Sequence, residues 1–248
     1  MTKKGGLGMR FFIEGNDLSG DVGSISAMSS PRGVLDKTGI NSSAMERVLT
    51  HTSGEITFVS HFNDAAGQEH PVLSALPATD VDVLVLQSAT AGDAGWALRG
   101  KQINYDGART ADGDLQMTTQ VLGNSSAVGL EDCKSVTAAK VTHASATSSA
   151  SIDDNGVAGS SAQGGIGFIQ VFSIGSGTPT FVLEDSPNDS VWATLISFGA
   201  DAAATGDRIT VTGNVDRYLR ATTTGTFTNA VFAMAFRRGT SADVVSLA

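Results

Sequence analysis

The sequence predicts a mainly β protein, and three observations support that fold class. Short runs in which apolar and polar residues alternate recur along the chain, which is the pattern of strands with one buried face. Glycine is frequent, at 29 residues against 5 prolines, and Ser, Thr and Ala are abundant between the runs. Hydrophobic residues make up 41% of the 248 positions, so the chain can form one large domain or two of ordinary size.

One short helix is expected in the first half. Ser43 is followed three residues later by Glu46, which is the spacing of a capping box at a helix N-terminus. Ala44 and Val48 then lie at helical spacing, and Gly54 is placed to end the helix. The expected helix would cover the apolar face of the strand that follows it.

That strand and a later one each have one apolar and one polar face. In residues 55–62, Ile56, Phe58 and Phe62 alternate with polar residues, and "DLQMTTQVLG" (114–123) repeats the pattern. A sheet of this kind has one face on a core and one face in water. The polar side chains of the two strands are Glu55, Thr57, Gln116, Thr118 and Gln120.

Two further strands and a long loop complete the first half. "VDVLVLQS" (81–88) is largely apolar and predicts a central strand, and residues 95–106 predict another. Two Asp-Gly pairs in "YDGARTADGD" (105–114) indicate hairpin turns. Residues 63–80 form a loop that is too long for a simple hairpin connection, with a short helical turn expected at residues 72–76.

The second half predicts a separate β-sandwich. Residues 134–165 hold few large apolar side chains and many Ser, Ala and Thr, which indicates a linker running into an edge strand. From Gly167 onward, strands recur at roughly ten-residue spacing with Gly, Asp and Asn turns. We therefore expect one β domain at 1–138 and a second at 139–248, with few contacts between them.

The chain is acidic in both halves. Lys and Arg number 16 against 25 Asp and Glu, which gives a formal net charge of −9. No stretch is a basic groove interleaved with aromatic residues, so tight nucleic-acid binding driven by counterion release is not expected. The single Cys133 excludes an intramolecular disulfide framework. No apolar run reaches 18 residues, and Arg10 and Glu14 interrupt the start, so we expect a soluble protein made in the cytoplasm.

No set of residues has the spacing of a catalytic, cofactor or metal site, and we expect no enzyme activity and no cofactor. The four histidines lack ligand spacing, and no Gly-x-Ser-x-Gly elbow occurs. Two acidic clusters are more readily interpreted as turn caps than as calcium ligands, because neither has the EF-hand spacing, although calcium stays open for both. The clusters are Asp153 with Asp154, and Glu184 with Asp185 and Asp189.

Three stretches of the first half carry a resemblance to a known family. They are "VLDKTGINSSAMERVLTHTSGEITFVSHFN" (34–63), "HPVLSALPATDVDVLVL" (70–86) and "WALRGKQINYDGARTADGDLQMTTQVLGN" (96–124). In their order of helix, alternating strand, long loop and paired long strands, they resemble the tail tube (major tail) proteins of long-tailed bacteriophages. "FIEGNDLSGDVGSIS" (12–26) is similar to the first strand of such proteins, and the second half resembles an additional C-terminal β-sandwich that some of them carry.

The resemblance implies a structural protein of the virion. It implies a tail-tube-like β-sandwich or barrel with one short helix, an N-terminal arm at 1–10, the long loop at 63–80 and an outward-facing C-terminal sandwich. Six copies would form a ring, and stacked rings would form the tail tube through which DNA passes transiently. Assembly would take place in the host cytoplasm, without a membrane and with the tape measure, terminator and distal tail proteins as further partners.

The resemblance also implies roles for particular residues. The polar side chains Glu55, Thr57, Gln116, Thr118 and Gln120 would line the lumen. Contacts between rings or subunits would come from the arm and the long loop, through Leu7, Met9, Val72, Leu73 and Leu76. The alternative is another virion β-protein, such as a capsid decoration or adhesin-like module. A carbohydrate-binding module is less favoured, because the sequence shows no paired carboxylates beside an aromatic platform.

Overall fold

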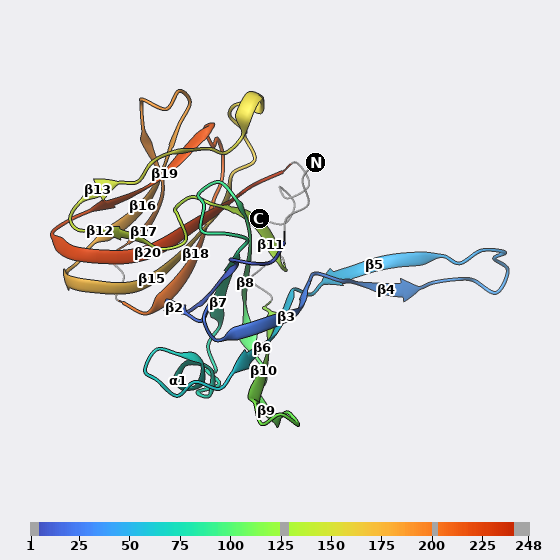
Figure 1. The fold of residues 1–248 in the computed structure, drawn as a ribbon. Helices are drawn as coiled ribbons and strands as arrows, with labels where there is room; N and C mark the ends of the chain where they lie inside the picture. Colours follow the sequence, from blue (N-terminus) through green and yellow to red (C-terminus); the bar gives the residue numbers. More distant parts are fainter. Residues whose placement is uncertain (1–4, 125–128, 200–202, 241–248) are drawn as a thin grey trace.

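Strands form nearly all of the regular structure, as the sequence predicts (Figure 1). The computed structural model describes residues 5–124, 129–199 and 203–240, so residues 1–4 of the expected N-terminal arm lie outside it. The first half contains β1 (Arg10–Ile13), β2 (Asn16–Asp17), β3 (Val22–Ser29), β4 (Arg32–Asp36), β5 (Arg47–Thr52), β6 (Glu55–His61), α1 (Glu69–Leu73), β7 (Val81–Leu86), β8 (Ala94–Gln102), β9 (Asp106–Arg109), β10 (Leu115–Gly123) and β11 (Glu131–Ser135). The second half contains β12 (Val141–His143), β13 (Thr147–Ser148), β14 (Ile152–Asp153), the 3-10 turn η1 (Gly156–Ala158), β15 (Gly165–Gly177), β16 (Thr180–Ser186), β17 (Ala193–Gly199), β18 (Thr205–Val211), β19 (Tyr218–Thr224) and β20 (Phe227–Arg238).

These strands form three sheets within the described residues. The largest has 13 strands, and its main path runs β18-β15-β20-β11-β8-β10-β6-β3. It therefore passes from the second half of the chain into the first where β20 pairs with β11. A five-stranded sheet contains β13, β19, β16 and β17, with β14 beside β19, and β4 and β5 form a two-stranded ribbon of their own.

The first half packs around β7, which is buried on both faces as expected for a central strand. Val83 and Val85 face a core that includes Phe58 from β6 and residues of β1, β8 and β10. Leu84 and Leu86 face the opposite way, into a second core. Because successive side chains of a strand point to opposite faces, one continuous apolar strand joins the two cores.

The helix expected from Ser43 onward is not formed, and that prediction is wrong. Residues Arg47–Thr52 are strand β5, and three of its six residues are β-branched, which favours a strand. Glu46, the acidic residue of the expected capping box, is bonded inside the hairpin loop instead. The hydroxyl of Thr38 accepts a hydrogen bond from the backbone N–H of Glu46 at 2.9 Å, and Ser42 donates to the Glu46 carboxylate at 3.2 Å.

The α-helix of the described residues is α1, which lies in the 63–80 loop, where the sequence predicts a helical turn slightly later. Two buried carboxylates, those of Asp21 and Glu69, connect it to the strands. Asp21 accepts the backbone N–H of Glu69 at 3.1 Å. The fully buried Glu69 carboxylate accepts from Ser60 at 2.9 Å and from the Tyr105 hydroxyl at 3.1 Å. The loop is therefore anchored at α1.

The second half is a β-sandwich, as predicted. Side chains of β15 and β20 from the large sheet face those of β16, β17 and β19 from the five-stranded sheet. Phe232 of β20 contacts Phe181 of β16 edge-on, with ring centroids 5.0 Å apart. The stretch 134–165 is not an unpaired linker, because β12 pairs with β20, and β13 and β14 pair with β19.

A shared hydrophobic core joins the two halves. The sequence predicts few contacts between them, and this expectation is wrong, although the boundary at residue 138 itself stays a prediction. The core takes Phe12, Leu84, Leu86, Ala97 and Cys133 from the first half and Ile166, Phe168, Ala233 and Ala235 from the second. Its Cys133 is a buried thiol whose pKa is raised by burial.

We expect a fragment ending at residue 138 to aggregate rather than fold alone. Removing the second half would uncover Phe12, Leu84 and Leu86, which are all fully buried in the intact chain. A large side chain left in water forfeits about 1.5–3 kcal/mol of burial, and a contiguous exposed apolar patch promotes association. Light scattering and circular dichroism would check this. A monomeric fragment that unfolds cooperatively would contradict it and support two independent domains.

Candidate assembly surfaces

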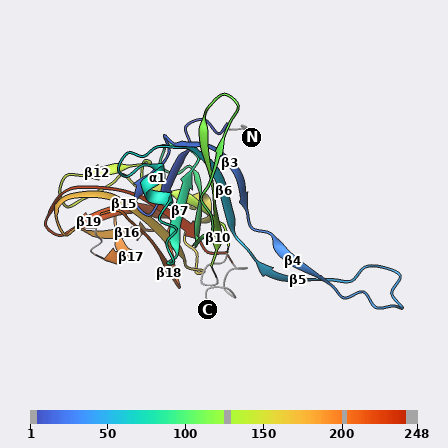
Figure 2. The same cartoon turned by 90° about the horizontal axis from the view of Figure 1, so that it is seen from below.

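The extended hairpin, defined as residues 31–53, projects from the rest of the molecule (Figures 1 and 2). It continues β3 and β6 beyond the large sheet, and every residue of its strands β4 and β5 is exposed. An isolated two-stranded ribbon is at best marginally stable in water. The extended hairpin would therefore gain most from contacts made outside its own subunit.

Each face of the extended hairpin carries one apolar pair of side chains. Val34 pairs with Leu49, and Leu35 pairs with Val48. Because consecutive side chains alternate, the two pairs lie on opposite faces of the ribbon. The four side chains are between 46% and 58% exposed. The loop at the tip adds two more exposed apolar side chains, Ile40 and Met45.

The extended hairpin also differs from the rest of the chain in charge. Its net charge is +1, against −10 for the remaining residues, and the two add to the −9 of the whole. Its acidic residues are Asp36 and Glu46. Within the described residues, none of its cations is in an ion pair: Arg32, Lys37 and Arg47. A partner for this surface would combine apolar side chains with negative charge.

An apolar groove of about 420 Å³ lies beside β3, the end strand of the large sheet's main path. Leu7 and Met9 line it from the N-terminal segment, and Val22, Ile25 and Met28 line it from β3. β3 leads directly into the extended hairpin (Figure 1). The groove, lined by residues of β3, therefore lies at the same edge of the sheet as the hairpin. An end strand of this kind offers free backbone groups to another chain.

The polar side chains expected to line a lumen do share one face of the sheet. Gln120 lies opposite Thr57 in the β10–β6 ladder, and both contact the same carboxylate. Glu55 accepts from Thr57 at 2.8 Å and from Gln120 at 2.8 Å. Gln116 donates to Asp114 at 2.8 Å, and Thr118 is half-buried on the same face. The alternate residues Ile56, Phe58, Met117 and Val121 are buried, which confirms the two-residue alternation at these positions, whereas Phe62 and Leu115 are exposed.

The five expected contact residues do not form one surface. Leu7 is exposed and Met9 half-buried, and both line the apolar groove. Leu73 is fully buried in the core of its own subunit, so it has no side-chain surface left for a neighbour. Val72 packs partly on that core, and Leu76 is exposed. Roles for the four residues other than Leu73 stay predictions.

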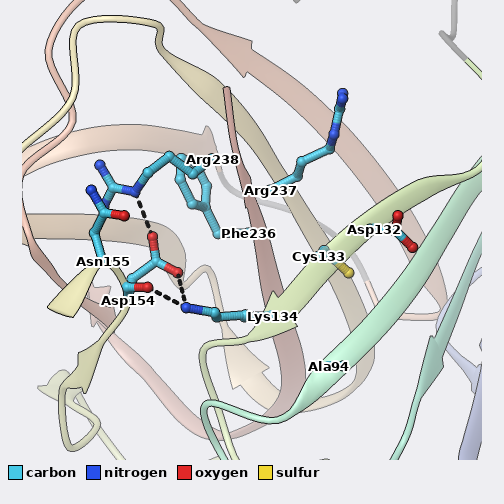
Figure 3. Close-up of a pocket in the computed structure, with 9 residues that line it drawn as sticks. All are labelled: Ala94, Asp132, Cys133, Lys134, Asp154, Asn155, Phe236, Arg237 and Arg238. Atoms are coloured by element: carbon cyan, nitrogen blue, oxygen red, sulfur yellow. Dashed lines mark hydrogen bonds and ion pairs between the residues drawn. The ribbon is translucent and has the colours of Figure 1, made fainter. Parts of the chain in front are cut away.

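A pocket of about 350 Å³ between the two halves is lined by charged side chains (Figure 3). Arg238 donates to the Asp154 carboxylate at 2.7 Å. Lys134 donates to the backbone carbonyl of Asp154 and lies 3.3 Å from its carboxylate. Arg237 lies 3.7 Å from Glu131. All three cations are therefore paired within the chain, and the pairs of Lys134 with Asp154 and of Arg237 with Glu131 link the two halves.

The acidic clusters considered for calcium are engaged with arginines and backbone groups. Arg217 binds Asp153 at 2.5 Å and lowers the pKa of that carboxyl to about 2. Glu184 pairs with Arg220 at 2.8 Å, and Asp185 accepts the backbone N–H of Asp216 at 2.7 Å. Across the described ranges, no group of three or more His, Cys, Asp or Glu side chains is arranged to hold a metal ion.

Two aromatic rings meet arginines on the outside of the second half. The Arg220 guanidinium lies 4.2 Å from the centre of the Trp192 ring, and that of Arg217 lies 4.8 Å from the Tyr218 ring. Trp192 and Tyr218 are both half-buried. The guanidinium groups therefore cover one face of each ring.

The buried His143 has its partners within the sandwich. Its ring nitrogens lie 2.8 Å from the Thr223 hydroxyl and 3.0 Å from that of Ser149, and burial lowers its pKa. A neutral imidazole bonded to two hydroxyls holds β12 against β19.

In the part of the chain that is described, no helix is long and apolar enough to cross a membrane.

The extended hairpin is the feature that the sequence prediction missed. A signal for it exists in the β-branched residues of β5 and in the apolar pair Val34 and Leu35 upstream. Between them lies "DKTG" (36–39), whose Asp and Gly suit a turn. The capping-box spacing at Ser43 outweighed this signal, because a pattern of four residues fits a hairpin loop as well as a helix start.

Comparison with known proteins finds no matching family model and no matching curated protein. Among solved structures, one similar protein is the Dit protein (gp 19.1) of phage SPP1, which is described as a paradigm of the hub adsorption apparatus in phages that infect Gram-positive hosts. It is 11% identical to this chain, with a TM-score of 0.33, and the match covers 94% of this chain and 99% of the Dit chain. Two structures of the phage p2 baseplate in its activated conformation are 8% and 10% identical, with TM-scores of 0.31 and 0.29, each covering 93% of this chain and 98% of that one. These TM-scores are too low to carry an inference about this chain.

Proposed function

We propose that this chain is a structural subunit of a bacteriophage tail that assembles with copies of itself. The observation that carries the proposal is the extended hairpin, whose two faces expose the pairs Val34–Leu49 and Leu35–Val48. Fully burying a large aliphatic side chain is worth about 1.5–3 kcal/mol, and the subunit leaves these four side chains half in water. The role is structural, and we propose no catalysis.

A second copy of the chain is the partner that best fits the hairpin. The hairpin carries +1 and unpaired cations, whereas the rest of each subunit carries −10. The groove lined by Leu7, Met9 and Ile25 presents apolar side chains at the sheet edge from which the hairpin emerges. Hairpin and groove are different surfaces, so the contact would be heterologous, and such contacts generate closed rings or open filaments.

The resemblance in sequence to tail tube proteins leads us to propose closed rings of six that stack into a tube. The polar face with Glu55, Thr57 and Gln120 would then line the lumen. Its acidic groups include Glu55 and Asp114. His61, which lies on β6 like Glu55, pairs with Asp114 at 3.0 Å. A neutral to acidic wall would repel the phosphates of passing DNA, whereas each basic contact would hold them.

Negative-stain electron microscopy of the purified full-length chain tests this proposal. Long hollow tubes of stacked rings are the expected result. Single rings that never stack would support the proposed self-assembly but overturn the proposed tube, and would place the chain elsewhere in the tail. Monomers or trimers at every protein concentration would overturn both, and would favour a capsid decoration or adhesin-like role.

A further inference from the structure

Arg10 at the start of β1 is a half-buried cation without a carboxylate partner. Within the described ranges it takes part in no ion pair, and its Nε is enclosed without an acceptor. The other arginines that are at least half-buried all lie in ion pairs: Arg99, Arg208, Arg217, Arg220, Arg237 and Arg238. Arg10 is therefore the exception among the half-buried arginines.

The unpaired Nε of Arg10 is also unlike the other enclosed polar atoms that lack a hydrogen-bond partner. Asp80 Oδ1 lies 2.7 Å from the Lys101 ammonium, so its charge is met. The hydroxyl of Thr119 is fully enclosed in the core. Leaving a buried donor without an acceptor costs about 1–3 kcal/mol, and more for a charged group. Arg10 also lines a pocket.

That pocket has a volume of about 370 Å³ and a lining suited to a small anion. Its polar residues are Arg10, Lys140 and Asp17, and the rest of its lining is Phe12, Ala89, Ala138 and Ala139. Alanine side chains leave room beside the guanidinium. An apolar lining also lowers the local dielectric, which strengthens an ion pair formed there.

Asp17 is committed to other partners and does not serve Arg10. Its carboxylate lies 2.6 Å from the Lys140 ammonium and accepts from both the hydroxyl and the backbone N–H of Ser19, at 2.5 and 3.1 Å. Lys140 also lies over the Phe172 ring, 5.2 Å from its centre. One carboxylate therefore neutralises one cation, and the pocket keeps a net charge of +1 at Arg10.

We propose that the Arg10 pocket binds a carboxylate group. A guanidinium offers five N–H donors in a planar fork that fits the two oxygens of a carboxylate. The carboxylate can be a free organic acid or an Asp or Glu side chain of a second copy of this acidic chain. The proposal rests on the pocket alone and does not require the extended hairpin to bind.

The test is NMR of the arginine Nε–H groups in the full-length chain carrying Val34→Glu and Leu49→Glu, which keeps the protein monomeric if the proposed function holds. The Arg10 signal is assigned by its loss in Arg10→Lys. Sodium acetate is the probe, and sodium chloride at equal ionic strength is the control. We expect acetate to shift the Arg10 signal saturably. The signal of the exposed Arg109, which is in no ion pair among the described residues, should move no more than that of free arginine. Equal movement of Arg10 and Arg109, or equal effects of chloride and acetate, would overturn the proposal.

The source of the carboxylate is separated by a second measurement on the chain without the hairpin substitutions. If a second copy supplies it, the Arg10 signal moves toward its acetate-bound position as protein concentration rises, and Arg10→Gln weakens self-association by roughly tenfold or more. If the Arg10 signal stays unchanged on assembly while acetate still binds, the pocket takes a free acid. Failure to assemble leaves the acetate result standing, so the two proposals fail separately.

Discussion

Charged substitutions on either apolar face of the extended hairpin should abolish self-assembly while leaving the subunit folded. Val34→Glu with Leu49→Glu changes one face, and Leu35→Glu with Val48→Glu changes the other. Each pair removes two apolar side chains worth about 1.5–3 kcal/mol each when buried, so we expect the dissociation constant to rise by roughly a hundredfold or more. Analytical ultracentrifugation over a range of protein concentrations would measure it.

The matched control adds the same charge without removing apolar surface. Asn41 and Ser43 are exposed in the loop of the hairpin, and Asn41→Glu with Ser43→Glu introduces two carboxylates there. We expect this variant to assemble far better than either strand variant. The free energy of unfolding of each variant should lie within about 0.5 kcal/mol of the parent's, because the substituted positions are exposed.

The two faces report separately on how the hairpin binds. Loss of assembly from both strand variants would mean that the ribbon lies between two surfaces. Loss from one alone would mean that it lies flat on a single partner. Assembly at the parent's level by both variants would show that the hairpin plays no part in it.

Substituting Glu131 should produce the largest loss of stability of any single charge change. Its side chain is 1% exposed and accepts from Arg208 at 2.8 and 2.7 Å, with Arg208 7% exposed. Glu131→Gln would leave that guanidinium buried without a counter-charge, and removing one partner of a buried pair costs about 3–5 kcal/mol. Urea unfolding followed by tryptophan fluorescence would measure the free energy of unfolding.

Two comparisons separate the buried charge from a general effect of losing an ion pair. Asp153→Asn breaks the exposed pair with Arg217 and should cost no more than about 1 kcal/mol. Glu131→Met combined with Arg208→Met removes both buried charges and should recover most of the stability lost in Glu131→Gln. A Glu131→Gln variant as stable as Asp153→Asn would show that the pair between β11 and β18 is not needed to join the halves.

Much of the fold was predictable because strand alternation is a local property. Ile56 and Phe58 enter the core while Glu55 and Thr57 stay at the surface, as their spacing requires. The assignment of residues 81–86 to a central strand is confirmed by burial on both faces. The sandwich in the second half likewise follows from strands at regular spacing with turn residues between them.

The functional surfaces were less predictable because they depend on what each segment packs against. Residues 43–53 have weak local preferences, and pairing with β4 selected a strand over a helix. Leu73 has the apolar character of a contact residue, but α1 turns it into the core of its own subunit. Arg10 is an ordinary basic residue in the sequence, and only the fold encloses its Nε without an acceptor.

The sequence by itself determined the β class, the acidic charge and the buried side of strands such as β6, since all three depend on composition and two-residue spacing. Tertiary structure alone decided that the halves share a core, because β20 and β11 meet across about a hundred residues of chain. It also decided that the hairpin stands free of its own subunit. No local pattern reports whether an apolar pair finds a partner within its chain, because that depends on the packing of segments distant in sequence.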